Sequence, residues 1–278
     1  MTLIVGIKCK DGVVVAADSA ATMSDGVVNT LGQQAVTKVQ PLGQGGVFAA
    51  TGSVGMAQTL RDKLGKWCDA NLTKLAGGLE AMAGLSEQVR QVVVPQLQAS
   101  AASVPLVGRD AAGSTAICKN LVAVVVRKQA HLFQFDHAGA PEMATTELPF
   151  ITLGSGQPIA DPFIAFLRRV LWAGREPTVA DGRLAAAWTV YHVCKTNPGG
   201  VGPPMQMATL RAGDDGKPLL EFSGDEEHLE AVTDAEKALR EHVAGKTEQD
   251  GAVPPRPNLT APVGVVASRA AGNDDARP

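Results

Sequence analysis

The amino-acid sequence predicts an α+β protein in which antiparallel sheets are covered by layers of helices. Runs of strand-like residues alternate with pairs of helical patterns, in the order strands, two helices, strands, two helices, strands. The chain opens with Asp11-Gly12 between two apolar runs, which is a strong signal for a β-hairpin. Groups of strands followed by groups of helices favour antiparallel sheets over a parallel βαβ arrangement.

Short runs of β-branched and other apolar residues that end at turn residues mark the expected strands. The run that ends at Gly52 and the valine-rich run before Arg127 are the clearest after the opening hairpin. The complete set of expected strands is 3–9, 13–18, 27–29, 35–40, 47–51, 114–127, 129–136, 150–153, 205–210 and 218–222.

Apolar residues at helical spacing predict four helices in the body of the chain. Ser53 is the expected N-cap of the first helix, Pro95 is expected to kink or end the second, and the fourth is expected to stop near Asn197. The four apolar stripes are Met56, Leu60, Leu64 and Trp67; Leu79, Met82, Leu85, Val89 and Val92; Phe163, Phe166, Leu167, Val170 and Leu171; and Leu184, Ala187, Trp188 and Tyr191.

Composition and charge exclude several classes of protein. The formal net charge is −3 and 45% of the residues are hydrophobic, so the chain has no basic footprint for nucleic acid or an anionic membrane. No apolar run approaches the roughly 20 residues that cross a bilayer, and the N-terminus lacks the features of a signal peptide. The four cysteines and five histidines show no metal or disulfide spacing, and no phosphate-binding loop is present. We expect a soluble cytoplasmic protein without a metal or cofactor.

The character of the chain changes after Phe222. Acidic residues precede an amphipathic pattern, which predicts a helix that ends at Gly245. Residues 246–278 are rich in proline, alanine, glycine and polar residues and show no periodicity, which is typical of disorder. We therefore expect a domain over residues 2–222 and an acidic C-terminal extension over residues 223–278.

Thr2 carries chemistry if removal of Met1 makes it the first residue. Its hydroxyl is then a nucleophile, and its α-amino group, with an ordinary pKa of about 7.7–8.0, is a base on the same residue. No histidine is needed for this chemistry. A threonine at position 2 has no functional meaning by itself.

Asp18 and Lys38 are candidates for tuning that amine. A nearby cation favours the neutral amine, and a carboxylate can hold the cation charged and oriented. Each residue alone is equally compatible with a solvated surface position. A two-residue hairpin turn puts Thr2 opposite about Ala21 and puts Asp18 on the other face of the hairpin, so contact requires a bulge or an intermediate such as Lys38.

Two short glycine-containing segments complete the candidate site. Gly52 lies at an expected strand-to-helix junction, where its backbone N–H can serve an oxyanion or its lack of a side chain can permit the turn. Ser155, in Gly154-Ser155-Gly156, precedes a helix and can either support the amine or cap that helix.

Read together and in order, several segments resemble the proteasome β-subunit family. The matching segments are Thr2 to Ile7, Lys10 to Ser19, Lys38-Val39, Ala50 to Gln58 and Leu153 to Gly156. Each segment is a weak motif alone, and the resemblance rests on their order over residues 2–222. Exposure of Thr2 by removal of Met1 is similar to the HslV branch. The longer chain and acidic extension are more similar to the betaproteobacterial proteasome homologues.

The resemblance implies a fold, a set of roles and an assembly. The fold is the four-layer αββα Ntn-hydrolase sandwich. By position, Thr2 is the nucleophile, Asp18 and Lys38 are the charge-tuning pair, Gly52 is the oxyanion donor and Ser155 supports the amine. The implied assembly is a homo-oligomer of stacked hexameric or heptameric rings around a chamber in which polypeptides are cleaved. An ATP-dependent unfoldase is the implied partner.

Two features depart from the family pattern. The interval from Asp18 to Lys38 is a few residues longer, which indicates a rebuilt loop. The family also supplies an aspartate and a serine from the loop after its fourth helix, and here Asn197 and Gly200 stand in those places. Asparagine offers no negative charge and glycine offers no side chain.

Three functions remain open from the sequence. The leading one is a threonine endopeptidase, with Ala21, Ala50 and Val54 in a substrate pocket that has room for a bulky apolar side chain. The second is a catalytically weak or inactive proteasome-like ring with a structural or binding role, which Asn197 and Gly200 favour. The third keeps the same nucleophile but acts on a small amide, as in penicillin-acylase-like relatives.

Overall fold

The computed structural model describes residues 2–20, 23–24, 29–30, 36–107, 117–197 and 200–250. The chain divides into two compact units, Met1–Ala235 and Glu236–Pro278. The first unit contains two large sheets and the helices that cover them. All of the contacts that define the candidate site lie within this unit.

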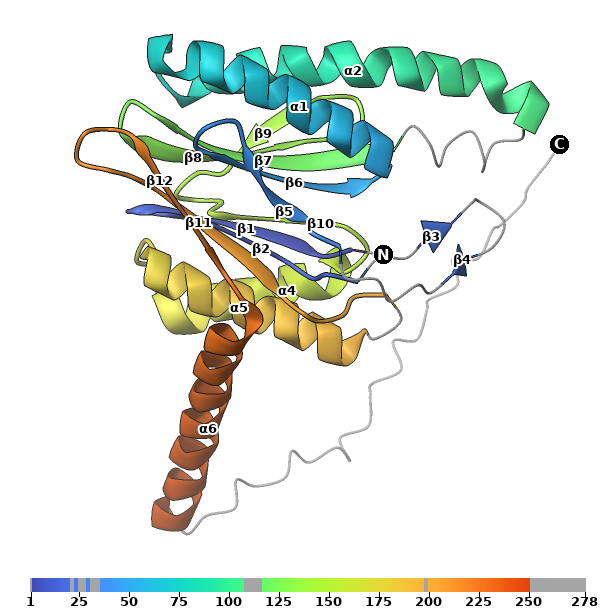
Figure 1. Ribbon diagram of the computed structural model, residues 1–278. Helices are drawn as coiled ribbons and strands as arrows, with labels where there is room; N and C mark the ends of the chain where they lie inside the picture. The colour runs from blue at the N-terminus through green and yellow to red at the C-terminus, as the bar shows by residue number, and fades with distance from the viewer. Residues whose placement is uncertain are drawn as a thin grey trace, which may run out of the picture. The chain divides into compact units, whose positions relative to one another are not determined.

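Two five-stranded antiparallel sheets stack at the centre of the first unit (Figure 1). The first sheet has the order β10-β1-β2-β11-β12, and the second has the order β5-β6-β7-β8-β9. The strands of the first sheet are β1 Ile4–Cys9, β2 Gly12–Ala17, β10 Phe150–Leu153, β11 Gln206–Ala212 and β12 Pro218–Ser223. Those of the second are β5 Val39–Leu42, β6 Gly46–Gly52, β7 Cys118–Val126, β8 Gln129–Phe135 and β9 Pro141–Met143. A short pair, β3 Met23–Ser24 and β4 Asn29–Thr30, stands apart.

Helices cover the outer face of each sheet. Helices α1 (Val54–Asn71) and α2 (Gly78–Val107), joined by the 3₁₀ turn η1 (Leu72–Lys74), lie over the second sheet. Helix α4 (Gln157–Leu167), the π-helical turn η2 (Arg168–Trp172) and α5 (Val179–Thr196) lie over the first sheet. The order helices, sheet, sheet, helices confirms the predicted αββα sandwich.

Strand alternation divides the apolar side chains among three layers. In β7, Leu121 and Ala123 face the first sheet, whereas Val122 and Val124 face α1 and α2. A third layer, which includes Val14 of β2, lies under α4 and α5. Successive residues of a strand point to opposite faces, so a strand buried on both sides needs apolar residues at consecutive positions. The valine-rich runs in the sequence meet this requirement.

Capping residues place the starts of two helices. Ser53 Oγ accepts a hydrogen bond from the Met56 backbone N–H at 3.5 Å, so its predicted role as N-cap is confirmed. Thr178 forms a capping box with Asp181 at the start of α5. Asn197 is the C-cap of α5, which agrees with the predicted end of that helix.

The opening hairpin turns through two residues as predicted, but these are Lys10 and Asp11 instead of Asp11 and Gly12, and the predicted alignment of Thr2 is not found. Cys9 pairs with Gly12 and Ile4 pairs with Ala17, so the ladder points toward Asp18 and Ser19 and not Ala21. The backbone N–H of Asp18 donates to the Leu3 carbonyl at 3.2 Å, which continues the pairing by one residue. The expectation that Thr2 lies opposite Ala21 was wrong, because the register is already set by the Lys10-Asp11 turn.

Several element boundaries differ from the prediction. The strand expected at 35–40 is β5, which begins at Val39, and the short strand β9 was not expected. Helix α2 continues through Pro95, which therefore does not end it. Proline removes one helical hydrogen bond, a loss that a long helix packed through its preceding turns can tolerate. Leu79, expected on the buried face, is 66% exposed, and that face is formed by Ala81, Leu85, Val89 and Val93.

Helix α6 runs from Asp225 to Asp250, so the predicted end at Gly245 is wrong. A glycine inside a helix costs only about 1 kcal/mol relative to alanine and need not end it. The first compact unit extends to Ala235 and includes the start of α6, where Val232 is buried. The expected disordered tail lies outside the described residues from residue 251 onward.

Candidate active site

Thr2, Lys38 and Gly52 line one cleft of about 360 Å³ at the end of the sandwich where β2 and β6 finish. Ala50 of β6 and Val54 of α1, two of the predicted pocket residues, also line it, and Val54 is 69% exposed. The segments come together because the two sheets stack, although they are far apart in sequence. Ala21, the third predicted pocket residue, lies outside the described residues.

Asp18 is fully buried directly after β2 and accepts hydrogen bonds on both carboxylate oxygens. Oδ1 accepts from the Leu3 backbone N–H at 2.8 Å and from Lys38 Nζ at 2.7 Å. Oδ2 accepts from the backbone N–H groups of Ala20 at 3.1 Å and Gly202 at 3.2 Å. Burying a carboxylate is costly unless its oxygens accept hydrogen bonds. The four donors satisfy both oxygens and fix the Asp18 side chain in one orientation.

Lys38 reaches Asp18 from the segment that precedes β5. Its ammonium donates to Asp18 Oδ1 and to the Ala20 carbonyl, both at 2.7 Å, and its side chain is 8% exposed. Burial lowers the pKa of Lys38 from its ordinary value, and the Asp18 carboxylate opposes that shift. The pair is therefore a desolvated charge pair at the edge of the cleft, not a solvated surface contact.

The turn between β10 and α4 surrounds Thr2. The Thr2 backbone nitrogen donates to Ser155 Oγ at 3.2 Å, and the Gly156 N–H donates to the Thr2 carbonyl at 3.2 Å. Gly154 has φ +101°, and a Cβ at this position would lie 2.0 Å from the Thr2 carbonyl oxygen. Glycine is thus required for the close approach of this turn to the N-terminal strand.

Gly52 ends β6 immediately before the α1 N-cap. Its φ is +106°, and a Cβ would lie 2.1 Å from the Ile117 carbonyl oxygen. The Ser53 N–H donates to that same Ile117 oxygen at 2.9 Å. The junction between strand and helix therefore requires glycine here, and it leaves Gly52 on the cleft wall near Thr2.

Asn197 and Gly200 do not line the cleft as the structure describes it. Asn197 ends α5, with its backbone N–H bonded to the Val193 carbonyl at 2.8 Å. The segment after α5 reaches the site through Gly202, whose N–H binds Asp18 and whose carbonyl accepts from the Ser19 N–H at 3.1 Å. Gly202 contributes only backbone atoms to these contacts, one of which is with the Asp18 side chain.

Sequence reasoning missed Gln206, which positions Lys38. The Gln206 Oε1 accepts from the backbone N–H groups of Lys38 at 2.8 Å and Val39 at 3.2 Å, and its Nε2 donates to the Val36 carbonyl at 2.6 Å. No local motif marks this residue, because it is 168 residues from Lys38 and only the pairing of β2 with β11 brings it there.

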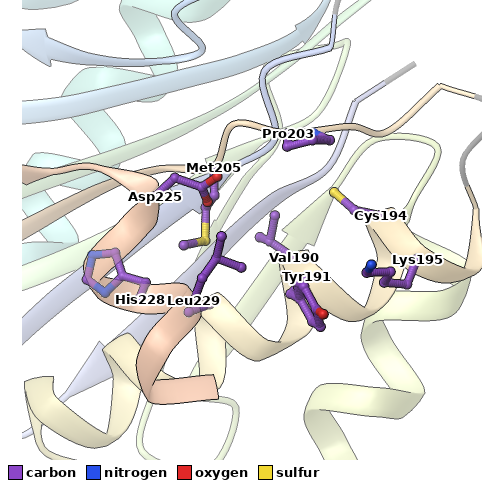
Figure 2. Close-up of a pocket in the computed structure, with 10 residues that line it drawn as sticks. Val190, Tyr191, Cys194, Lys195, Pro203, Met205, Asp225, His228 and Leu229 are labelled. Carbon is purple, nitrogen blue, oxygen red and sulfur yellow. The ribbon is translucent and has the colours of Figure 1, made fainter. Parts of the chain in front are cut away.

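A second cavity of about 280 Å³ lies between the end of α5 and the first turns of α6 (Figure 2). Its walls are mostly apolar, with Val190, Cys194 and Met205 among them. Burial raises the pKa of the Cys194 thiol to about 12, so this thiol is not a nucleophile at neutral pH. The cavity shares no lining residue with the Thr2 cleft.

The described part of the chain contains neither a cluster of metal-ligating side chains nor a membrane-spanning helix. Within it, no group of three or more histidine, cysteine, aspartate or glutamate side chains could hold a metal ion. None of the described helices is long and apolar enough to span a bilayer.

The four-layer sandwich, with a threonine before its first strand and a buried lysine–aspartate pair beside it, is the Ntn-hydrolase fold of proteasome subunits. Residues 2–83 match the model of the proteasome subunit family, which confirms the resemblance found in the sequence. The described fold is similar to Anbu (ancestral beta-subunit) from Yersinia bercovieri, with a TM-score of 0.59 and 16% identity over 87% of this chain and 96% of that one.

Two further solved structures show the same fold. Anbu from Hyphomicrobium sp. strain MC1 has a TM-score of 0.60 and 16% identity, over 87% of this chain and 97% of that one. The helical assembly of the Anbu complex from Pseudomonas aeruginosa has a TM-score of 0.60 and 17% identity, over 93% of this chain and 99% of that one. No curated protein matches the chain.

Proposed function

We propose that this protein is an N-terminal threonine endopeptidase whose nucleophile is Thr2 after removal of Met1. One observation carries the proposal: Thr2, Lys38 and Gly52 line a single cleft, and Asp18 holds the Lys38 ammonium at its edge. The proteasome family match over residues 2–83 covers these four residues. The cleft lies at the surface of the described fold, where an extended polypeptide has access to it.

In the proposed reaction, the Thr2 hydroxyl oxygen attacks a peptide carbonyl carbon while the free α-amine takes the hydroxyl proton. The Gly52 N–H is assigned to the developing oxyanion. Collapse of the intermediate breaks the C–N bond, and the amine passes its proton to the leaving nitrogen. Water then attacks the ester, again with the amine as base, and Thr2 is regenerated as the acid product leaves.

The surrounding residues fit roles that support the amine. The Lys38 charge favours the neutral, proton-accepting amine by repulsion between like charges. Ser155 Oγ, at 3.2 Å from the Thr2 nitrogen, can orient that amine and exchange a proton with it. These assignments require no metal or cofactor.

We propose that the chain acts as a homo-oligomer, in stacked hexameric or heptameric rings, on polypeptides delivered by an ATP-dependent unfoldase. Support comes from the proteasome family match and from the Pseudomonas aeruginosa Anbu, whose title describes a helical assembly. Repetition of one interface closes into a ring or continues as a helix, depending on its rotation. Electron microscopy of the purified protein distinguishes closed rings, an open helix and separate monomers, and monomers would refute this part of the proposal.

The test of the chemistry is covalent labelling with a peptide epoxyketone, read by intact-mass and fragment mass spectrometry on protein whose Thr2 terminus is verified. This warhead reacts with both the hydroxyl and the amine of one N-terminal residue. We expect a cyclic adduct on Thr2 that is lost in Thr2→Ala and at least tenfold slower in Lys38→Ala. Lys66→Ala, which removes a lysine from an exposed pair, is the matched control and should label at the wild-type rate.

A second candidate is a catalytically weak or inactive ring, favoured by Asn197 and Gly200 in place of an acidic and a hydroxyl residue. Assembled protein with a free Thr2 that does not react with the epoxyketone would support this candidate over the peptidase. Cleavage of small amides without cleavage of peptides would instead support a small-amide hydrolase.

A further inference from the structure

Asn120 has a buried side-chain amide without hydrogen bonds. It lies on the strand next to β6, which contributes Ala50 to the wall of the cleft. It lies in β7, is fully buried, and neither Nδ2 nor Oδ1 has a hydrogen-bond partner among the described residues. A buried donor or acceptor left unpaired costs roughly 1–3 kcal/mol, so such a group in a strand made mostly of apolar residues requires an explanation.

The sheet register places Asn120 directly beside Ala50. The two residues are cross-strand partners between β6 and β7, and Phe135 is the partner of Asn120 on its other side. Both neighbours face α1 and α2, on the same side of the sheet as Phe48 and Val122. Partners in a ladder have Cβ atoms about 4.5–5.5 Å apart, so the Asn120 side chain lies next to the Ala50 methyl group; Ala50 lines the cleft and Asn120 does not.

The cleft is otherwise suited to a neutral side chain. Among its described lining residues, Lys38 is the one charged side chain, and its ammonium is already bound to Asp18. Gln40 and Gln58 contribute neutral amides at the cleft, and Gln40 Oε1 accepts a hydrogen bond from the Arg61 guanidinium. The other described lining residues are three threonines, Thr2, Thr37 and Thr51, and uncharged apolar or small residues such as Phe48 and Ala57.

We infer that Asn120 is a specificity-determining residue of the proposed peptidase, and that it selects a substrate side chain ending in a primary carboxamide, that of glutamine. This inference rests on the proposed function. A glutamine side chain that passes the small Ala50 methyl presents one donor and one acceptor, which match the two unpaired atoms of Asn120. An apolar side chain of similar length would leave both Asn120 atoms unpaired, and a site built in this way discriminates strongly against it. The substrate class therefore differs from the bulky apolar side chain expected from Ala50 and Val54.

The test compares fluorogenic peptides that are identical except for glutamine, methionine or glutamate immediately before the cleaved bond. In the wild type, kcat/KM for the glutamine peptide should exceed that for methionine at least tenfold. Asn120→Leu, which keeps the number and branching of the side-chain heavy atoms, should reduce this ratio at least tenfold, and it should raise the melting temperature because it removes an unpaired buried amide. Ala50→Leu should also reduce the ratio by closing the path to Asn120.

The control is Trp172→Phe, which removes the other unpaired buried polar atom of the described residues, Trp172 Nε1, on the opposite side of the sandwich. It should leave the ratio unchanged. The inference would be overturned by a wild-type ratio near one or by an unchanged ratio in Asn120→Leu. A lower melting temperature in Asn120→Leu would also overturn it, because it would indicate that the Asn120 amide has a structural partner such as a buried water. Preference for glutamate over glutamine would also overturn the inference, because it would indicate selection by a positive charge instead of by the Asn120 amide.

Epoxyketone labelling separates the two possible failures. If Thr2 is labelled and the peptides are cleaved without preference for glutamine, the inference about Asn120 fails and the peptidase stands. If Thr2 is not labelled and no peptide is cleaved, the proposed function fails and the inference fails with it.

Discussion

Lys38 and Leu3 bind the same oxygen of Asp18. The Lys38 ammonium donates to Asp18 Oδ1 at 2.7 Å, and the backbone N–H of Leu3 donates to it at 2.8 Å. The position of the residue after Thr2 is therefore coupled through one carboxylate oxygen to the position of the lysine. The sequence predicted Asp18 and Thr2 on opposite faces of the hairpin. Lys38 connects them, because it lines the cleft with Thr2 and binds Asp18, which does not line the cleft.

We predict that Asp18→Asn destabilises the fold by about 3–5 kcal/mol, because it leaves the buried Lys38 charge without its partner and turns an amide toward backbone donors. Urea denaturation measures the change, and epoxyketone labelling should be lost in parallel. The control is Asp62→Asn, which breaks the exposed pair with Lys66 and should cost less than about 1 kcal/mol. Equal losses in the two variants would contradict the buried-pair interpretation.

The labelling rate of Thr2 should depend on pH with two limbs. It rises as the α-amine loses its proton, near or below the ordinary pKa of about 7.7–8.0. It falls again as Lys38 deprotonates, and because burial lowers the pKa of Lys38, this limb should begin below the ordinary lysine value of about 10.4. The measurement is the inactivation rate across this range. Lys38→Arg keeps its charge and should lose the alkaline limb, and a limb that persists in this variant would assign it to another group.

Gly52→Ala should destabilise the protein by about 1–3 kcal/mol and abolish labelling. The substitution forces an L-residue into φ +106° and brings its Cβ to 2.1 Å from the Ile117 carbonyl oxygen. The matched control is Gly55→Ala, three residues away in the first turn of α1, where a Cβ meets nothing within 4 Å. That change should be neutral or stabilise by up to about 1 kcal/mol. Thermal unfolding of both variants tests the contrast.

His228 should make stability depend on pH. It is 4% exposed, and its Nε2 lies 2.7 Å from Ser223 Oγ at the start of α6. Burial and the Arg183 charge lower its pKa, against the opposing effect of nearby carboxylates, so the unfolded chain binds this proton more readily than the folded chain. The contribution to stability is complete above the unfolded pKa of about 6.5 and is lost as pH falls toward the lower folded value.

The measurement is the free energy of unfolding by urea at about pH 8 and pH 5.5. His228→Gln should lose less stability between these two values than the wild type does. His137→Gln, at an exposed position, is the control and should behave as the wild type. A wild-type protein that is equally stable at both values would show that His228 carries no such linkage.

Truncation should separate the two parts of α6. Deletion after Gly245 should leave folding and assembly intact, because the first compact unit ends at Ala235. Deletion from Asp225 onward removes Val232, which is 1% exposed in the core under α5, and should lower the free energy of unfolding by about 2 kcal/mol or more. Melting temperature and size-exclusion chromatography measure both effects. An insoluble protein truncated after Gly245 would show that residues beyond it are needed.

The strongest sequence signals were local patterns, each of which is typical of one kind of structure. Asp11-Gly12 between apolar runs leads to one hairpin, and Ser53 before a 3.6-residue pattern leads to one helix start. Pro95 shows the limit of such rules. Its local preference opposes a helix, but the packed turns before it, with Leu85, Val89 and Val93 in the core, keep the helix intact.

By itself, the sequence determined the order of strands and helices and the antiparallel sheets covered by helices, because these follow from periodicity and turn residues. The αββα sandwich and the candidate set of Thr2, Asp18, Lys38, Gly52 and Ser155 followed from the resemblance of ordered motifs to the proteasome β-subunit family. Only the tertiary structure decided which distant atoms complete the site. Gly202 binds Asp18, Gln206 binds the Lys38 backbone, and Asn120 lies behind Ala50. These contacts depend on sheet register and on the stacking of two sheets. A residue that reaches the site through such long-range pairing has no characteristic local sequence pattern, so it is not identified from the sequence.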